Sequence, residues 1–509
     1  MSQRGLNGQS MERFDHDPRA SGILLHPTSL RTDFGIGDLG PAAHQWVDFV
    51  ADTGTALWQI LPLGPTGYGD SPYQCFSTFA GNPYLISPTL LLADGLVSQA
   101  DLDAYPELPA DRVDYGSVIT AKLELLDAAF ARFQTIGVGD LRDEYEIFRV
   151  QQASWLDDFG LFMALKDRHQ GRPWTVWERP LRVFQADAVA AARTELAGDI
   201  ERHAFRQFVC FRQWRAVREH ANRRDISIIG DIPIYVASDS ADVWANQRRF
   251  LLDQEGRSIV VAGVPPDYFS ATGQLWGNPL YDWDEQAAEG YMWWIERIRA
   301  TLEMVDIVRI DHFRAFADYW EVPATAPTAE TGRWLDGPGE AIFQAIRAAL
   351  GQLPIIAEDL GELSPAVPEL RDRLGLPGMK IFQFGFDDDE SHPFLPHNYP
   401  ERCVAYTGTH DNQTVSGWWA TATGAERELA MRYLDWDGSY PAPRFLEAVW
   451  ASRAMFAVAP LQDFLGLDDR ARMNTPGTTG DNWTWRISAD ALSPALARSI
   501  SELNARHGR

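Results

Sequence analysis

Short apolar segments, each bounded by polar or turn-forming residues, recur eight times along the chain. Uninterrupted apolar runs of this length are typical of parallel strands that are buried on both faces. The segments lie at residues 22–25, 56–61, 226–232, 304–308, 353–358, 379–384, 404–407 and 454–458. Helix-like stretches such as 41–53 and 340–350 separate several of them, and this alternation predicts an α/β protein with a (β/α)8 TIM barrel. A doubly wound open sheet is the alternative, which the number of strands disfavours.

Two long segments interrupt this alternation. Residues 64–225 are rich in proline and glycine at first and helix-like afterwards, which is too much chain for a single crossover. We therefore expect one barrel domain over residues 21–509, with large, mainly helical insertions at about 64–225 and 240–300, after a disordered leader at 1–20. A chain of 509 residues exceeds one ordinary core, but barrels with insertions reach this size.

Charge and cysteine content restrict the class of partner. The formal net charge of −26 argues against nucleic-acid and anionic-membrane partners, because both bind basic surfaces. The cysteines, Cys75, Cys210 and Cys403, lack C-x-x-C spacing and are expected to be free thiols in a reducing compartment. The N-terminus has no apolar signal region, so a cytoplasmic protein is expected.

One glycine-rich motif, at residues 35–40, matches the G-x-G-x-x-G pattern of dinucleotide-binding loops. Such a loop begins directly at a strand end, because its glycines must bring the backbone against the pyrophosphate. Here nine residues, including Pro27, separate the motif from the preceding strand. We therefore expect no nucleotide cofactor.

Four of the predicted strands end in acidic residues: Asp231, Asp311, Glu358 and Asp411. A single acid at this position is commonly a helix N-cap. Four acids at one rim of a barrel would repel one another and raise their pKa values, which indicates a functional arrangement. Cleavage of a glycosidic bond requires one protonated carboxyl group and one carboxylate in this way.

Local surroundings suggest different roles for these acids. Asp311 lies two residues after Arg309, on the same side of its strand, and is expected to stay negatively charged as a nucleophile. This segment alone is equally compatible with a structural ion pair. Glu358 follows the apolar residues 355–357, which should raise its pKa and suit it to general acid catalysis. The neighbouring His410 offers hydrogen bonds to sugar hydroxyls.

A metal site is the main rival chemistry for these acids and histidines. His312 and His410 each adjoin an acid, but neither belongs to an i, i+4 pair of ligands. We therefore expect no metal.

Several motifs resemble those of the α-amylase superfamily, and more narrowly those of the 4-alpha-glucanotransferases, or amylomaltases, of glycoside hydrolase family 77. The matching segments are GPTGYGDSPY (64–73), GDIPIYV (230–236), GVPPDYF (263–269), QLWGNP (274–279), RIDHFR (309–314), AEDLG (357–361), TGTHDN (407–412) and NTPGT (474–478). The resemblance covers nearly the whole chain from about residue 21. It implies a barrel without a C-terminal β-sandwich. Ala315 is one departure, since many relatives have glycine there.

The resemblance implies roles for individual residues. Asp311 would form a covalent glycosyl intermediate, Glu358 would act first as acid and then as base, and Asp411 would hold hydroxyls of the distorted sugar. Retention of configuration implies about 5 to 5.5 Å between the carboxyl groups of Asp311 and Glu358. The implied substrate-binding residues are Tyr68, Asp231, Asp267, Tyr268, Phe269, Trp276, Asn278, Arg309, His312, His410 and Asn474.

The implied activity is transfer of α-1,4-glucan segments from maltooligosaccharides, starch or glycogen to an acceptor 4-hydroxyl, without cofactor or metal, by a monomer or small homo-oligomer. A hydrolytic α-amylase-like enzyme and a non-catalytic glucan-binding protein are the alternatives. We interpret residues 264–269 as an aromatic lid that excludes water and thereby favours transfer over hydrolysis.

Overall fold

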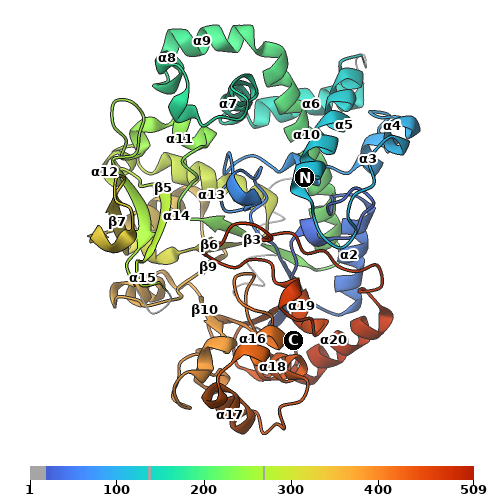
Figure 1. The fold of residues 1–509 in the computed structure, drawn as a ribbon, viewed down its shortest axis with the longest axis vertical. Helices are drawn as coiled ribbons and strands as arrows, with labels where there is room; N and C mark the ends of the chain where they lie inside the picture. Colours follow the sequence, from blue (N-terminus) through green and yellow to red (C-terminus); the bar gives the residue numbers. More distant parts are fainter. Residues whose placement is uncertain (1–18, 136–138, 267–269) are drawn as a thin grey trace.

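A barrel of parallel strands forms the centre of the computed structural model, which describes residues 19–135, 139–266 and 270–509 (Figure 1). Eight strands within this part form one sheet in the order β10-β11-β12-β1-β2-β3-β6-β9. Their bounds are β1 (Ala20–Leu24), β2 (Leu57–Gln59), β3 (Ser227–Pro233), β6 (Ile307–Asp311), β9 (Ile355–Ala357), β10 (Gly378–Ile381), β11 (Cys403–Tyr406) and β12 (Phe456–Pro460). The predicted strands and the barrel class are confirmed.

The barrel closes between its first and last strands in this order, β10 and β9. There the Ala357 N–H donates to the Pro377 carbonyl oxygen at 2.9 Å. The other neighbouring strands pair in parallel register. Parallel pairing places all carboxyl ends of the strands at the same rim, which is where barrels of this class carry their chemistry.

Helices cover the outside of the barrel, which is why its strands are apolar on both faces. The helix α2 (Pro41–Asp52) begins with proline at its first turn and buries Trp46 and Val50 against the strands. The covering helices also include α13 (Met292–Met304), α14 (Glu340–Leu350), α15 (Ala366–Leu374), α16 (Val415–Thr421), α17 (Gly424–Tyr433), α18 (Pro441–Ala451), α19 (Leu461–Phe464) and α20 (Pro494–His507). The helices predicted at 41–53 and 340–350 are confirmed as α2 and α14.

The first long segment between strands is helical, as predicted. It carries α3 (Pro88–Ala93), α4 (Gln99–Asp103), α5 (Tyr115–Thr135), α6 (Asp140–Gln151), α7 (Leu156–Arg168), α8 (Arg179–Arg182), α9 (Ala186–Glu195) and α10 (Ala197–Asn222). The long helix α10 contacts α2 of the barrel as well as α5, α6 and α7, so it joins the two parts. The division into insertion subdomains stays a prediction.

A second sheet, which the sequence pattern did not predict, lies beside the barrel rim (Figure 1). It is antiparallel, in the order β5-β4-β7-β8. Its strands are β4 (Val260–Val264), β5 (Gln274–Pro279), β7 (Asp318–Pro323) and β8 (Arg333–Asp336). Two of them fall in the segment 240–300, where we expected mainly helix. The structure also places the helices α11 (Ala241–Ala245) and α12 (Trp283–Ala288) in this segment. The strands β5, β7 and β8 carry polar or charged residues and are partly exposed, so they lack the apolar runs that identify the barrel strands, whereas the apolar run of β4 was not recognised as a strand.

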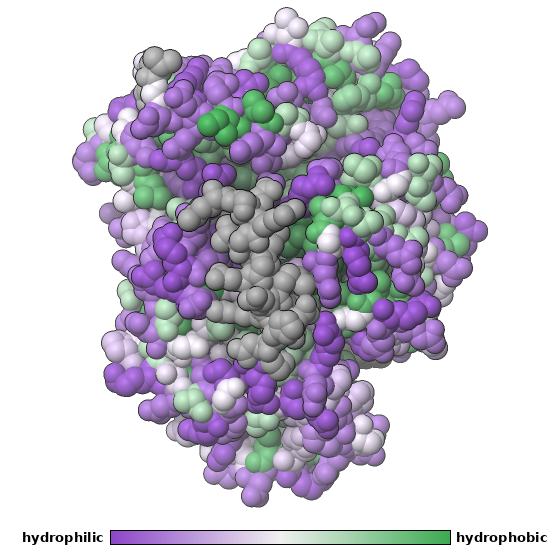
Figure 2. Space-filling view, turned by 180° about the vertical axis from the view of Figure 1, so that it is seen from behind, coloured by the Kyte–Doolittle hydropathy of each residue, from purple (hydrophilic) through white to green (hydrophobic). Residues whose placement is uncertain are grey.

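Hydrophilic residues cover most of the face in Figure 2, and apolar patches are scattered across it. In the part of the chain that the structure describes, no helix is long and apolar enough to cross a bilayer. The predicted leader falls largely on residues 1–18, which lie outside the described residues.

Asp306 joins the barrel to the helical insertion. Its carboxylate accepts hydrogen bonds from Arg218 and Asn222 of α10 and from the Ile228 N–H, all between 2.8 and 3.1 Å, and its side chain is 1% exposed. Removing one partner of a buried ion pair leaves the other charge uncompensated.

We therefore expect Asp306→Ala to lower the free energy of unfolding by about 3–5 kcal/mol. Urea unfolding followed by tryptophan fluorescence measures this loss. Glu124→Ala, which removes an exposed carboxylate from α5, is the control and should change stability by less than about 0.5 kcal/mol. A loss of under about 1 kcal/mol for Asp306→Ala would contradict the assignment.

Candidate active site

The four predicted acids lie at the same rim of the barrel. Asp231 lies near the end of β3 and Asp311 ends β6, while Glu358 and Asp411 follow β9 and β11. The β3–β6 register pairs Asp231 with Arg309, and the β6–β9 register pairs Ile310 with Ala357, directly before Glu358. The structure therefore brings Asp231, Asp311 and Glu358 together on three adjacent strands.

Arg309 connects two of these acids. Its guanidinium donates to Asp231 Oδ2 at 2.5 Å and to Asp311 Oδ1 at 2.9 Å. The arginine is only 3% exposed, so both bonds form in a region of low polarity where charge-assisted hydrogen bonds are strong. Arg309 thus holds carboxylates from neighbouring strands at a distance that their mutual repulsion would otherwise oppose.

Glu358 lies beside this group in a half-buried position. Its carboxyl oxygens accept from the His312 N–H at 2.7 Å and from the Leu360 N–H at 3.0 Å. Burial and the negative charge of Asp311 raise the pKa of Glu358, and Arg309 and the two amides offset only part of this rise. The direction agrees with the expectation from the apolar residues before Glu358, and it favours a protonated carboxyl group that can act as an acid.

His312 adopts a left-handed backbone conformation, with φ of 52° and ψ of 48°. Such a conformation is uncommon for a residue other than glycine. Here it turns the His312 N–H toward Glu358 and places the imidazole edge-on against Trp276, with ring centroids 4.8 Å apart. Burial lowers the pKa of His312 to about 4, so the ring is neutral near neutral pH.

Asp411 is surrounded by hydrogen-bond donors. Asn474 Nδ2 donates to Asp411 Oδ1 at 2.6 Å, and His410 Nε2 lies 3.3 Å from Oδ2. Burial opposes ionisation, but His410 and the hydrogen bonds from His410 and Asn474 lower the pKa of Asp411 to about 2. Arg472 donates to the backbone carbonyl of Asp411 at 2.5 Å, which fixes the loop. Asp411 is therefore a carboxylate held in one orientation.

Tyr73 contacts both Asp231 and His410, and it was not identified as a site residue from the sequence. Its hydroxyl donates to Asp231 Oδ2 at 2.8 Å, and its ring stacks on His410 with centroids 5.2 Å apart. The residue ends the motif at 64–73, which pointed to a binding loop without indicating which tyrosine turns inward. Tyr68 of the same motif is 79% exposed.

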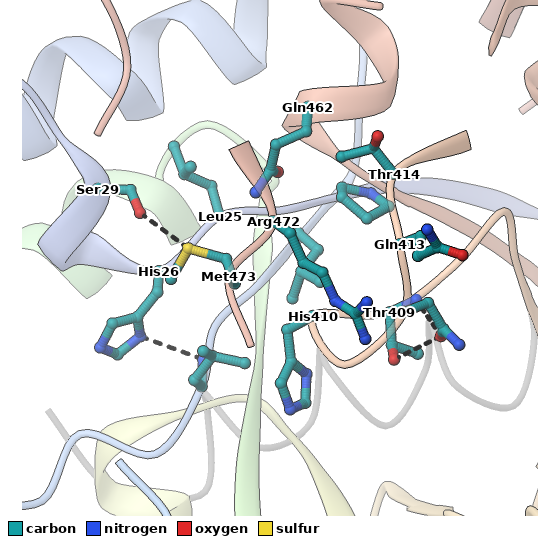
Figure 3. Close-up of a pocket in the computed structure, with 14 residues that line it drawn as sticks. Leu25, His26, Ser29, Thr409, His410, Gln413, Thr414, Gln462, Arg472 and Met473 are labelled. Atoms are coloured by element: carbon teal, nitrogen blue, oxygen red, sulfur yellow. Dashed lines mark hydrogen bonds between the residues drawn. The ribbon is translucent and has the colours of Figure 1, made fainter. Parts of the chain in front are cut away.

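A small cavity of about 20 Å³ lies behind His410 (Figure 3). Figure 3 shows His26, Ser29 and Met473 lining it together with His410, and Ser29 donates to Met473 Sδ at 3.6 Å. The volume suits one water molecule but no sugar ring. A sugar ring therefore does not fit into this cavity.

A larger cavity of about 470 Å³ lies on the outer side of the site. Tyr68, Trp276, Asn474 and Trp483 are among the residues that line it. Its volume and aromatic lining suit an organic ligand of several rings. Asn278 is placed differently, because its amide donates to the Val236 carbonyl at 2.8 Å and accepts from Gln74 at 3.4 Å, which holds the loop after β3.

The remaining predicted site residues, Asp267, Tyr268 and Phe269, lie outside the described residues. Over residues 19–135, 139–266 and 270–509, no three His, Cys, Asp or Glu side chains form a group that could hold a metal ion. The expectation of a site without metal stays a prediction.

Comparisons with known proteins agree with the geometry of the site. A sequence model of the family described as 4-alpha-glucanotransferase matches residues 25–492. The chain is 50% identical to the 4-alpha-glucanotransferase of Thermus thermophilus, over 96% of this chain and 99% of the relative. It is 48% identical to that of Synechocystis sp., over 97% and 98%. The solved amylomaltase from Streptococcus agalactiae in complex with acarbose superposes with a TM-score of 0.93 at 38% identity, over 96% of this chain and 99% of that chain.

The raised pKa of Glu358 predicts a pH-dependent gain in stability for Glu358→Gln. The folded protein binds this proton more tightly than the unfolded chain, so the contribution of Glu358 to stability falls as pH rises above the ordinary glutamate pKa of 4.5. Glutamine does not titrate. The thermal midpoint of Glu358→Gln relative to wild type should therefore be higher at about pH 7.5 than at about pH 4.5.

Glu362→Gln is the matched control, because Glu362 is an exposed glutamate in the same loop. Its midpoint relative to wild type should not vary with pH. A gain for Glu358→Gln that is equal at both pH values, or larger at the lower one, would show that Glu358 is not held protonated.

Proposed function

This chain belongs to the 4-alpha-glucanotransferase family, and we propose that it is a retaining transglycosylase that moves α-1,4-glucan segments. The donor is a maltooligosaccharide, starch or glycogen chain, and the acceptor is the 4-hydroxyl of another glucan or of glucose. The observation that carries the proposal is the placement of Asp311, bound by Arg309, beside Glu358, whose pKa is raised. These are the two carboxyl groups that retaining cleavage requires.

In the first step Glu358 gives its proton to the glycosidic oxygen while an Asp311 oxygen forms a bond to the anomeric carbon. The bond between that carbon and the leaving oxygen breaks, and the shortened glucan departs with a new hydroxyl group. Glu358 is left as a carboxylate, which the His312 and Leu360 N–H groups stabilise. Burial therefore favours the acid before this step, and the amide donors limit the cost of the base after it.

In the second step the Glu358 carboxylate takes the proton of an acceptor 4-hydroxyl, whose oxygen attacks the anomeric carbon. The bond to Asp311 breaks, and two inversions give net retention. The predicted separation of about 5 to 5.5 Å between the two carboxyl groups belongs to this mechanism.

Asp411 and Asp231 are the acceptors for hydroxyl groups of the reacting sugar. Asp411 is held as a carboxylate by Asn474 and His410. Asp231 Oδ2 is occupied by Arg309 and Tyr73, whereas its Oδ1 is buried and has no hydrogen-bond partner among the described residues. A buried acceptor without a partner is costly, and a sugar hydroxyl would satisfy it once substrate binding opens a path to this oxygen, because the Asp231 side chain is 0% exposed here.

Transfer competes with hydrolysis for the same covalent intermediate. The cavity beside Trp276 and Trp483 offers flat apolar faces on which an acceptor sugar can stack, and that binding favours attack by sugar over attack by water. The proposed lid at 264–269 would add to this by excluding water.

Other expectations remain proposals. A cytoplasmic location is supported by the three cysteines, which are buried free thiols. Action without a nucleic-acid or membrane partner is supported by the net charge of −26. We further propose a monomer or small homo-oligomer.

Incubation with maltotriose alone tests transfer directly. A transglycosylase should produce glucose and a ladder of longer oligosaccharides, and the total of reducing ends should stay constant. Chromatography of the products and a reducing-end assay measure both quantities. Glucose and maltose with rising reducing ends would identify a hydrolase instead.

Asp311→Asn tests the nucleophile and excludes a protein that only binds glucan. We expect turnover of maltotriose to fall at least about 1000-fold, because the covalent step is lost. Binding of maltooligosaccharide, measured by calorimetry, should change little. The matched control is Asp336→Asn, an exposed aspartate on β8, which should keep wild-type turnover. Turnover of Asp311→Asn within about tenfold of wild type would refute the assignment.

A further inference from the structure

The strand before Glu358 is paired unequally on its two sides. Toward β6, the backbone bonds continue past the strand: Glu358 N–H donates to the Ile310 carbonyl, and Phe313 N–H donates to the Glu358 carbonyl, both at 3.0 Å. Toward β10, the backbone bond between the strands is the one from Ala357 to Pro377. Glu358 thus lies at the seam between β9 and β10, where few backbone hydrogen bonds join neighbouring strands of the barrel.

At this seam the side chain of Asp359 accepts a hydrogen bond that the backbone would otherwise accept. In a regular parallel ladder that contains the bond from Ala357 to Pro377, the Met379 N–H would donate to the Ala357 carbonyl. It donates instead to Asp359 Oδ1, at 2.7 Å. A Cβ added to Gly378 would lie 2.4 Å from Asp359 Oδ2, so only glycine leaves room for the carboxylate. A side chain therefore replaces a backbone bond in closing the barrel.

The Asp359 carboxylate is itself held firmly. Its side chain is 3% exposed, and its second oxygen is paired with Arg371 of α15. Arg371 also pairs with the exposed Asp372, which does not reach the seam. A buried carboxylate is costly to desolvate, so two specific bonds on it fix the local backbone rather than merely filling space.

Two links run from this carboxylate to the reacting groups. Asp359 stands between Glu358 and Leu360, and the Leu360 N–H donates to Glu358 Oε1 at 3.0 Å. On the other strand, Met379 Sδ accepts from Arg309 Nε at 3.4 Å. The bond from the Met379 N–H to Asp359 therefore fixes the amide that binds Glu358, whereas Asp311 is held by Arg309, which Asp231 binds on its other side.

We infer that Asp359 is a positioning residue for the proton transfers of Glu358, acting by locking β9 to β10 at the seam. The inference rests on the proposed function, in which Glu358 is the acid and base. A displaced Glu358 should slow the steps that need a proton and spare those that do not.

Two pairs of glycosyl donor and acceptor distinguish steps that need a proton from Glu358 from steps that do not. Cleavage of maltotriose needs a proton on the leaving oxygen, and its acceptor must lose one. With α-maltosyl fluoride as donor and azide as acceptor, fluoride leaves and azide attacks as anions, so neither step needs Glu358. The variants to compare are Asp359→Ala, Asp359→Asn, Glu358→Gln and the control Asp372→Asn.

For Asp359→Ala we expect kcat on maltotriose to fall about 10- to 100-fold with KM within about threefold, as for a displaced catalytic group. The fluoride–azide rate should stay within about threefold of wild type. Asp359→Asn retains an acceptor for the Met379 N–H and should fall less than Asp359→Ala, and it serves alone if Asp359→Ala does not fold. Asp372→Asn should match wild type on both pairs.

Several results would overturn the inference: equal losses on both pairs, no loss on either, or the same loss in Asp372→Asn. Glu358→Gln separates this failure from that of the proposed function. If Glu358→Gln itself loses both rates equally, its acid–base role is wrong. If it loses only the maltotriose rate while the Asp359 variants do not, only the positioning role is wrong.

Discussion

One buried guanidinium, that of Arg309, makes it possible for several acids to occupy one rim of this barrel. It donates to both Asp231 and Asp311. Arg309 is paired with Asp231 in the β3–β6 register and lies two residues before Asp311 on β6. Without it, two carboxylates in a poorly solvated site would repel each other and bind protons instead of serving as nucleophile and acceptor. The same negative charge at Asp311 contributes to the raised pKa of Glu358. One ion-pair network thus keeps Asp311 negatively charged and helps to keep Glu358 protonated.

The fold supplies what this network requires. Parallel strands put side chains two residues apart on the same side, and a closed barrel puts all strand ends at one rim. Between β3 and β6, and between β6 and β9, regular ladders hold the three reacting strands in register. On the far side of Glu358 the ladder gives way to the carboxylate of Asp359. The position of Glu358 therefore depends on backbone pairing with β6 on one side and on the side chain of Asp359 on the other.

The sequence predicted the features that depend on local pattern. The barrel strands are recognisable because they are buried on both faces, and the acids are recognisable because they directly follow those strands. Features that depend on register or on contacts between distant segments were not predictable. Three strands of the antiparallel sheet, β5, β7 and β8, are partly exposed and carry polar residues. The inward turn of Tyr73 depends on Asp231 and His410, and the role of Asp359 depends on Met379, 20 residues further along. The roles of residues 267–269 remain predictions.

The central claim is that Asp311, and no other acid of the rim, becomes covalently bonded to the sugar. It can be tested with a glucosyl fluoride that carries a second fluorine on the ring, which slows breakdown of the covalent intermediate. After reaction and proteolysis, mass spectrometry should find one sugar, on the peptide that contains Asp311, and none when Asp311 is replaced by asparagine. A sugar on the peptide that contains Asp231, Glu358 or Asp411 would contradict the account.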